Sequence, residues 1–272
     1  MNIDAIIRQV NAGDRITADQ GLALFRKAGL LTLGSLADNI RALRHPENQV
    51  TYVVDRNINY TNICESGCRF CAFYKTPSDP EGYVLSKEEL KAKIKETLSL
   101  GGTQILLQGG LNPDLGLDFY LDLLRFIKDN FTIHVHGFSP PEIQYLAIKN
   151  KTSVKDILTQ FQNAGLDSIP GGGAEILCDE VRTRVSPNKC MSGPWLEVME
   201  QAHGLGMRSS ATMMFGHLEQ DHHIIEHMEK LRNLQDDTGG FTAFIPWTFQ
   251  PGNTKIRVKK KTSAEYLKVL AL

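Results

Sequence analysis

From Thr51 onward the sequence alternates short apolar stretches with longer amphipathic ones, and this rhythm limits its fold more than any other feature. Parallel strands need crossover helices between them, so a series of strand–helix units indicates a parallel barrel. Six such units are visible, which predicts an α/β fold of the parallel (βα) TIM type. The expected strands are 52–60, 103–108, 132–138, 167–170, 207–215 and 242–247.

The expected helices lie between these strands. Ser86-x-x-Glu89 is a capping box, in which the serine and glutamate side chains satisfy each other's backbone N–H groups at a helix start. It predicts a helix from there to about residue 100. The other helices of the barrel are expected at 117–130, 142–149, 154–164, 194–205 and 222–235.

The two ends of the chain differ from this pattern. Residues 1–50 indicate helices at 4–12, after the capping box Thr17-x-x-Gln20, and at 35–43, and so predict an N-terminal helical extension. Residues 51–272 form the predicted barrel. Thr262-x-x-Glu265 begins one more helix shortly before Leu272. Since eight units close a full barrel, the C-terminal units are expected to be missing: either the barrel is partial, or the chain is a truncated piece, which we favour.

Composition narrows the class of protein. The formal net charge of −1, from 30 basic and 31 acidic residues, lacks the basic excess of a protein that binds nucleic acid or an anionic membrane. No stretch approaches the roughly 18 apolar residues of a membrane span, and five unevenly spaced cysteines do not indicate a disulfide framework. A cytoplasmic protein is expected. The densest basic run, 255–261, is typical of a solvated loop and less often of contact with an anionic ligand or partner.

The most specific motif is Cys64-Glu-Ser-Gly-Cys68-Arg-Phe-Cys71, directly after the first expected strand. Three thiolates in one loop can each bind one iron of a [4Fe-4S] cluster. With no fourth cysteine nearby, one iron is left open to an exogenous ligand. Active sites of parallel barrels lie at this end of the strands.

Two other readings of the cysteines are weaker. A structural zinc site prefers four ligands and would have to recruit Cys178, Cys190 or a histidine from afar. Three unrelated buried thiols are the other alternative. Cys178 and Cys190 are expected to be core or surface thiols.

The wording of several motifs resembles radical S-adenosylmethionine (SAM) enzymes of the cyclic dehypoxanthine futalosine synthase family, of the futalosine route to menaquinone. The resemblance spans nearly the entire chain, and family members continue past its end. Its relatives are aminofutalosine synthase and the FO synthase subunits. The motifs are Asn57-Ile-Asn-Tyr-Thr-Asn62-Ile-Cys64, Cys68-Arg-Phe-Cys71-Ala-Phe-Tyr74, Leu107-Gln-Gly-Gly-Leu-Asn-Pro113, Ser168-Ile-Pro-Gly-Gly-Gly-Ala-Glu-Ile-Leu177, Ala211-Thr-Met-Met-Phe-Gly-His217 and Gly240-Phe-Thr-Ala-Phe-Ile-Pro-Trp247.

The resemblance implies two cofactors, a [4Fe-4S] cluster on Cys64, Cys68 and Cys71, and SAM, as well as an electron donor such as a flavodoxin or ferredoxin. Reductive cleavage of SAM would give a 5′-deoxyadenosyl radical that removes the ribose C4′ hydrogen of dehypoxanthine futalosine, and the carbon radical would then close a ring. Aminofutalosine synthase or an FO-synthase-like activity is the nearest alternative.

Residues at the other strand ends are the candidates for binding SAM. The turn Gln108-Gly109-Gly110 corresponds to one that contacts the SAM amino group in such enzymes, and glycines allow a close backbone approach. Ser139 and Glu142 are candidates for the ribose or the ammonium group, although an N-cap role explains them equally well. The remaining cofactor candidates are Gly172, in a run of three glycines, and Met214.

Catalytic and substrate-binding roles fall on residues of the same face. Glu175 is expected to meet a ribose hydroxyl. His217 is a candidate for proton transfer, although a histidine of this kind is more often only hydrogen-bonded. Arg182 is expected to hold a substrate carboxylate, with a surface salt bridge as the more common alternative. Trp247 is expected to stack on an aromatic substrate, with core packing as the alternative. His134 and His136 point to one side of their strand; His136 is expected near the substrate, while a metal-dependent hydrolase that uses both histidines is the distant alternative.

Overall fold

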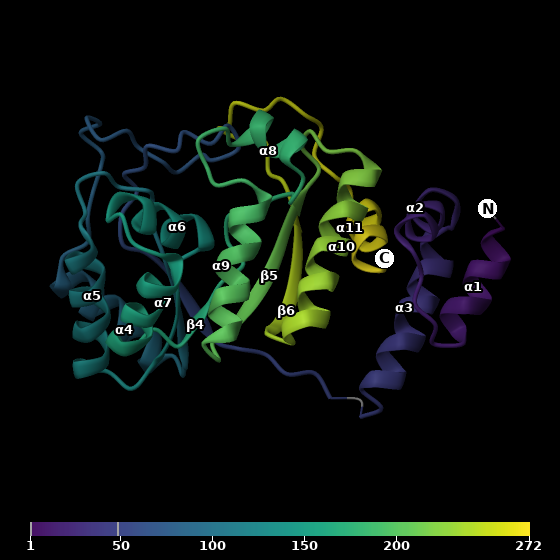
Figure 1. Cartoon of the computed structure of the whole chain (residues 1–272), viewed down its shortest axis with the longest axis horizontal. Coiled ribbons are helices and arrows are strands. Elements are labelled where there is room, and N and C mark those ends of the chain that lie inside the picture. Colours follow the sequence, from purple (N-terminus) through teal and green to yellow (C-terminus); the bar gives the residue numbers. More distant parts are fainter. Residues whose placement is uncertain (1, 48) are drawn as a thin grey trace.

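The computed structural model describes residues 2–47 and 49–272 and shows six parallel strands that curl into a half-barrel (Figure 1). The strands are ordered as in the sequence, so each βα unit adds the next strand to the same edge. This confirms the predicted α/β barrel of six units. The strands are β1 Asp55–Asn59, β2 Gln104–Gln108, β3 His134–Gly137, β4 Ser168–Ile169, β5 Arg208–Phe215 and β6 Phe241–Thr248.

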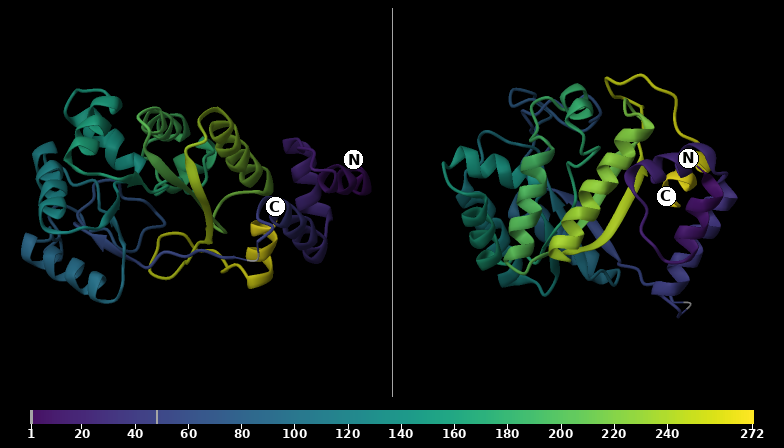
Figure 2. Two further views of the ribbon diagram at one scale, coloured as in Figure 1. Left: turned by 90° about the horizontal axis from the view of Figure 1, so that it is seen from below. Right: turned by 45° about the vertical axis from the view of Figure 1, so that its right-hand side comes forward.

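Helices cover the convex face of the sheet, and the largest apolar core lies between these two layers (Figure 2). Ile105, Val135 and Ile169 are fully buried on strands that face α-helices. The helices after β1 are α4 Lys87–Ser99, α5 Leu117–Asn130, α6 Pro140–Lys149, α7 Val154–Ala164, α8 Asp179–Val185, α9 Ser192–Gly204, α10 Asp221–Thr238 and α11 Ser263–Leu270.

The strand β4 is the weakest part of the sheet ladder, because only Ser168 pairs with β3. Side chains reinforce this seam. Ser168 Oγ lies 2.6 Å from Nε2 of His134 and 2.6 Å from Nδ1 of His136, and the other ring nitrogen of His136 lies 3.1 Å from Ser210 Oγ. These hydrogen bonds tie β3, β4 and β5 together on the inner face of the half-barrel.

The first three helices, α1 Ile3–Asn11, α2 Ala18–Lys27 and α3 Leu30–Arg44, form a layer with its own small apolar cluster. The chain from Gln49 to Val54 then passes below the sheet to β1, so the first helices lie beside the last ones, α10 and α11 (Figure 1). An ion pair between Arg26 and Asp221 joins α2 to α10. The helical extension is confirmed as helical, whereas the division at residue 50 stays a prediction.

Most expected element boundaries fall within a few residues of those observed, and the capping boxes at Thr17, Ser86 and Thr262 are all present. Two helices differ. The helix α3 begins at Leu30, five residues before the expected start, and α8 has no counterpart among the expected helices. In the described part of the chain, no helix has the length and apolar character needed to cross a bilayer.

Candidate functional site

The cysteine loop leaves the C-terminal end of β1 and is fixed by backbone contacts to its neighbours. Cys64 N–H donates to the Lys75 carbonyl at 2.9 Å, and Leu111 N–H, just after β2, donates to Cys64 Sγ at 3.2 Å. Gly67 has φ of +62°, the left-handed conformation that glycine adopts at no steric cost and that turns the loop toward Cys68. Burial raises the pKa of the Cys64 thiol, and backbone N–H groups oppose this. Iron, which binds the thiolate, would displace the proton.

The three cysteines line one cavity of about 610 Å³ at the C-terminal ends of β1, β2 and β3. This volume lies in the range of small-ligand sites. Five more of the predicted cofactor residues line the same cavity. They are Gln108, Gly109, Gly110, Ser139 and Glu142.

The donor set fits a cluster better than a single metal ion. No group of three or more His, Cys, Asp or Glu side chains in residues 2–47 and 49–272 gathers around one metal-sized position. Cluster thiolates each bind a different iron, so they need to surround a volume and not a point. Cys64, Cys68 and Cys71 all border the one cavity, which is consistent with this need.

The turn after β2 can approach the cysteine loop only because it lacks side chains. A Cβ on Gly110 would lie 2.2 Å from the Ile63 carbonyl oxygen and 2.7 Å from Cys64 Cβ. A Cβ on Gly109 would lie 2.4 Å from the Tyr60 ring. Both glycines are therefore required by packing, and their backbone forms a wall of the cavity.

Glu142 has a different place from the one expected of a cofactor ligand. Oε1 accepts hydrogen bonds from Tyr60 Oη at 2.6 Å and Gly109 N–H at 3.2 Å, and Oε2 accepts from the N–H and hydroxyl of Ser139 at 2.8 and 2.5 Å. Burial raises the pKa of this carboxyl, against those four hydrogen bonds. The capping alternative is confirmed. Glu142 and Ser139 hold three strand ends together and leave no carboxylate oxygen without a partner.

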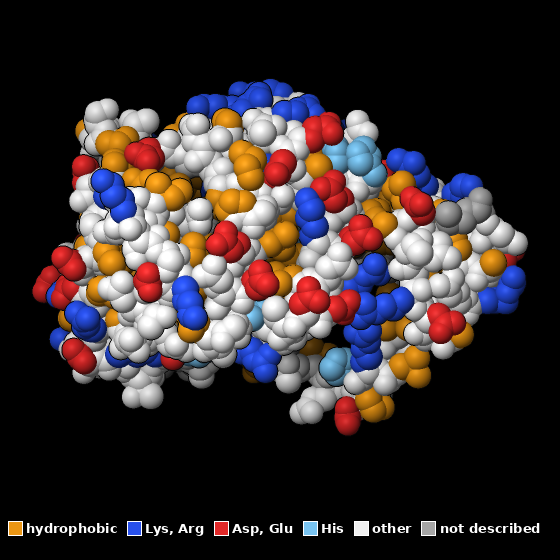
Figure 3. All heavy atoms as spheres, viewed as in Figure 1, with side chains coloured by type: hydrophobic (Ala, Val, Ile, Leu, Met, Phe, Trp, Pro, Cys, Tyr) orange, Lys and Arg blue, Asp and Glu red, His pale blue; other side chains and the backbone are white. Residues whose placement is uncertain are grey.

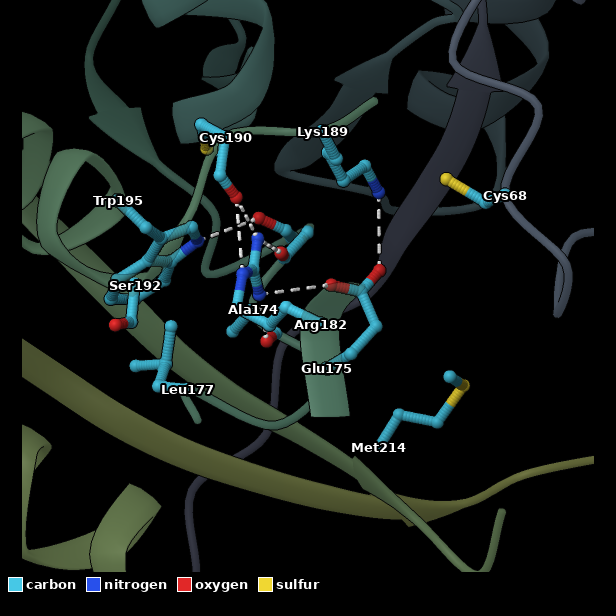
Figure 4. Close-up of polar contacts among 12 residues, drawn as sticks. Cys68, Ala174, Glu175, Leu177, Arg182, Lys189, Cys190, Ser192, Trp195 and Met214 are labelled. Carbon is cyan, nitrogen blue, oxygen red and sulfur yellow. Dashed lines mark hydrogen bonds and ion pairs between the residues drawn. The ribbon is translucent and has the colours of Figure 1, made fainter. Parts of the chain in front are cut away.

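Glu175 and Lys189 form a buried ion pair beside the cysteine loop. Lys189 Nζ donates to Glu175 Oε1 at 3.1 Å and lies 5.3 Å from the Phe70 ring centre, and it points toward Cys68 (Figure 4). Burial works against the charge of Lys189, but attraction to Cys68 and Glu175 outweighs it and raises the pKa of the ammonium. Glu175 Oε2 is buried without a hydrogen-bond partner among the described residues. Glu175 also has φ of +42°, a strained conformation for a non-glycine residue.

The predicted contact of Arg182 with a substrate carboxylate is wrong for this structure. Its guanidinium is fully buried and donates to the carbonyls of Ala174 at 2.6 Å, Gly173 at 3.1 Å and Cys190 at 3.1 Å (Figure 4). It lies 3.7 Å from Glu175 Oε2. The fork of donors fastens the glycine-rich loop to the turn that carries Lys189, so Arg182 positions the ion pair.

His217 takes the hydrogen-bonded role that was the alternative to proton transfer. Nε2 donates to the Met214 carbonyl at 2.9 Å and Nδ1 accepts from Leu218 N–H at 2.7 Å. Burial lowers the pKa of the ring against the opposing effect of Glu219. Because both nitrogens are occupied within its own turn, the ring has no free position for a substrate proton.

Three further predicted residues lie next to the cavity lining or on β5 and β6. Gly172 packs against Gln108, whose Nε2 would be 2.3 Å from an added Cβ. Met214 N–H donates to the Glu175 carbonyl at 2.9 Å, and Met214 pairs in register with Trp247 of β6. The neighbouring Pro246 is buried on the helix side, so Trp247 lies on the inner face, where 42% of its surface is exposed.

His136 faces the inside of the half-barrel, as expected. Both its ring nitrogens are occupied by serines, and burial lowers the pKa of the ring to about 4, with His134 adding to the effect. His134 shares Ser168 with it. The pair is thus part of a hydrogen-bond chain between strands.

Lys189 is the site residue that sequence reasoning missed. It lies 14 positions after its partner, in a loop, and no periodic pattern links the two. Asn57 and Asn59 were missed as well, and both line the cavity. Their signal was available: two polar side chains at alternate positions of a strand point to the same face.

Residues 58–231 match the radical SAM superfamily. The chain belongs to the radical SAM superfamily. As a member it is an enzyme that uses a [4Fe-4S] cluster and SAM. In fold it is similar to HydG, an FeFe-hydrogenase maturase, with a TM-score of 0.74 and 15% identity over 98% of this chain and 59% of that one.

The chain is 44% identical to the cyclic dehypoxanthine futalosine synthase of Halalkalibacterium halodurans, over 100% of this chain and 74% of that protein. It is 41% identical to the protein of the same name from Streptomyces coelicolor, over 100% of this chain and 69% of the relative. The chain is 40% identical to the 5-amino-6-(D-ribitylamino)uracil–L-tyrosine 4-hydroxyphenyl transferase of Methanopyrus kandleri, over 94% of this chain and 69% of that protein.

Proposed function

We propose that this radical SAM enzyme is a cyclase that converts dehypoxanthine futalosine to cyclic dehypoxanthine futalosine in menaquinone biosynthesis. The proposal rests on sequence identities of 44% and 41%, over the whole of this chain, with two proteins of that name. The site supports it, because a cysteine loop and a ligand-sized cavity lie at the face where barrels carry out catalysis.

Cys64, Cys68 and Cys71 are proposed to hold three irons of the cluster. When bound and reduced by one electron, the cluster and SAM would supply the radical chemistry that removes the C4′ hydrogen of the substrate ribose. The protein's own residues hold the reactants in place and exclude water. Phe70 and Lys189 close the side of the cavity next to Cys68.

SAM is proposed to lie across the ends of β2, β3 and β4. The backbone of Gly109 and Gly110 offers polar groups without side chains in the way. Glu175 is the carboxylate best suited to a ribose hydroxyl, because its Oε2 is buried next to the cavity wall without a hydrogen-bond partner among the described residues. A bound hydroxyl would satisfy that oxygen, which otherwise costs free energy.

The substrate is proposed to occupy the inner face below SAM. Trp247 and Met214 give this face an aromatic and a thioether contact. His136 contributes a neutral polar edge, since its depressed pKa keeps the ring uncharged at pH 7.

A two-substrate assay tests the proposal. The protein, reconstituted without oxygen and reduced with dithionite, is given SAM and either dehypoxanthine futalosine or the enolpyruvyl benzoate substrate of aminofutalosine synthase. Mass spectrometry is expected to find 5′-deoxyadenosine and a cyclised product only with the first. Product from the second substrate alone would contradict the cyclase assignment.

A second candidate rests on the transferase relative from Methanopyrus kandleri, which matches almost as well, and on FO synthases, which match over most of the chain. Such an activity would consume L-tyrosine and 5-amino-6-(D-ribitylamino)uracil. Adding both compounds in a third arm of the same assay distinguishes it.

A further inference from the structure

Lys189 places a largely buried positive charge beside Cys68. Only 16% of the Lys189 side chain is exposed, and Cys68 is 6% exposed. The ammonium points toward Cys68, and both residues line the same cavity (Figure 4). The Phe70 ring centre lies 5.3 Å from Lys189 Nζ and covers part of the ammonium. A charge in such a place is screened much less by solvent ions than a charge on the surface.

One anion and a second cation complete this buried group. Glu175 contacts both cations: Oε1 accepts from Lys189 Nζ at 3.1 Å, and Oε2 lies 3.7 Å from Nη1 of Arg182. Two cations and one anion leave the group positive as a whole. Its ammonium faces Cys68, whereas the Arg182 guanidinium lies on the other side of Glu175 and donates to backbone carbonyls (Figure 4). The nearest charge has the largest effect on the sulfur, and here it is positive.

The cysteine sulfur atoms also have unequal hydrogen bonding. Ser66 Oγ, itself buried, lies 3.1 Å from Cys68 Sγ. Cys64 Sγ accepts from Leu111 N–H at 3.2 Å. Cys68 therefore combines a hydroxyl contact with the nearby ammonium. Hydrogen bonds to the ligand sulfurs and charges close to them are among the features that set the reduction potential of an iron–sulfur cluster.

We propose that the Lys189 ammonium raises the reduction potential of the [4Fe-4S] cluster, so that Lys189 acts through Cys68 and not by contact with the substrate. The inference rests on the cluster ligands of the proposed function. Reduction adds one electron from an external reductant to the cluster, and no bond forms or breaks. A nearby cation stabilises the added negative charge, and a nearby anion destabilises it. Removing the charge of Lys189 therefore makes reduction harder, and removing that of Glu175 makes it easier.

The test is a dithionite titration of the reconstituted 272-residue protein, followed by electron paramagnetic resonance without oxygen and without SAM. Leaving SAM out removes any effect of the two side chains on cofactor binding. In Lys189→Met the equilibrium constant for reduction is expected to fall about tenfold, which is about 59 mV for one electron. In Glu175→Gln it is expected to rise about threefold. Lys189→Arg keeps the charge and should stay within about twofold of the unaltered protein.

Lys255→Met is the matched control, because it removes the same charge next to the same loop. Lys255 N–H donates to the carbonyl of Arg69, between Cys68 and Cys71, at 2.9 Å. Its side chain is exposed, in the loop after β6, where Lys and Arg side chains gather on the surface (Figure 3). In about 0.5 M salt this variant should titrate like the unaltered protein, while the shift in Lys189→Met should persist.

Equal potentials in Lys189→Met and the unaltered protein would overturn the proposal. So would shifts of the same sign in Lys189→Met and Glu175→Gln, because a general disturbance of the loop does not change sign with the charge removed. If Lys189→Met retains no iron, Glu175→Gln decides: a higher potential supports the proposal, and an unchanged or lower one contradicts it. An unaltered protein that binds no cluster would overturn the proposed function as well, whereas unshifted potentials in iron-loaded proteins would overturn this inference alone.

Discussion

Individual side chains in this site act mostly on one another. Arg182 donates its hydrogen bonds to backbone carbonyls, and Glu142 accepts hydrogen bonds from residues at three strand ends. Lys189 pairs with Glu175. Polar groups that are buried must be paired, so a charged residue inside a barrel is more often a support than a ligand. Glu175 Oε2 is an exception among the described residues, which is why it is the favoured contact for a cofactor.

The buried pair of Lys189 and Glu175 predicts strong coupling. Lys189→Met leaves the Glu175 carboxylate short of a partner and is expected to lower the free energy of unfolding by about 1–3 kcal/mol. Adding Glu175→Gln to that variant should restore much of the loss, because the buried carboxylate charge that has lost Lys189 is then gone, while Arg182 keeps its hydrogen bonds to backbone carbonyls. Urea unfolding of the four proteins measures the cycle. Losses that simply add would show that the two side chains do not interact.

His227 predicts a loss of stability in acid. Its Nδ1 accepts from Leu177 N–H at 2.9 Å, and burial, with Arg182 and Lys230, lowers the ring pKa to about 3 from 6.5. Between these values the unfolded chain binds a proton that the folded chain excludes, so stability falls as pH drops from about 6.5 toward 3, by up to about 1.4 kcal/mol per pH unit.

The check is urea unfolding of the cluster-free protein at pH 7 and pH 5. His227→Asn keeps an acceptor for Leu177 N–H but cannot titrate, so its stability should change less between the two pH values. Identical pH dependence in both proteins would exclude His227 as a source of acid sensitivity.

Among the elements, strand ends matter more than strand interiors. The turn after β2 touches the cysteine loop after β1 so closely that a side chain has no room. The β4 strand contributes a two-residue ladder, yet the loop after it carries Glu175 in a strained conformation. Short strands thus bring the loops of neighbouring units into contact at one face.

This contact predicts a specific effect of Gly110→Ala. The new Cβ would push the Ile63 carbonyl and Cys64 away. This shift is expected to lower the free energy of unfolding by about 1–3 kcal/mol. It should also reduce the iron retained after reconstitution. Gly34→Ala in α3 is the control, since a Cβ there meets nothing within 4 Å. This variant should raise the free energy of unfolding by about 0.5–1 kcal/mol, because alanine favours the helix over glycine. Iron content and thermal unfolding measure both. Full iron retention in Gly110→Ala would mean that the turn can move without disturbing the loop.

Elements also show what the sequence could and could not predict. Capping boxes and apolar periods are local signals, and they located α4 and α5 almost to the residue. The cysteine spacing predicted the centre of the site for the same reason. Arg182 was misjudged and Lys189 was missed, because their partners are a side chain and backbone carbonyls that only the folded chain brings near.

At the scale of the whole molecule, the proposed catalytic face and the N-terminal helices lie in different parts of the half-barrel. The C-terminal face holds the cysteines and the cavity, while the N-terminal helices pack against α10 and α11 at the far edge. The proposed chemistry is therefore confined to one face of the half-barrel.

The central claim is that SAM binds a cluster in which one iron has no cysteine ligand. Electron paramagnetic resonance of the reduced, reconstituted protein tests this claim most directly. About four irons per chain and a change of the cluster signal on adding SAM are expected, with both lost in Cys68→Ala and retained in Cys178→Ser. A signal that does not respond to SAM, or full iron content in Cys68→Ala, would contradict the account.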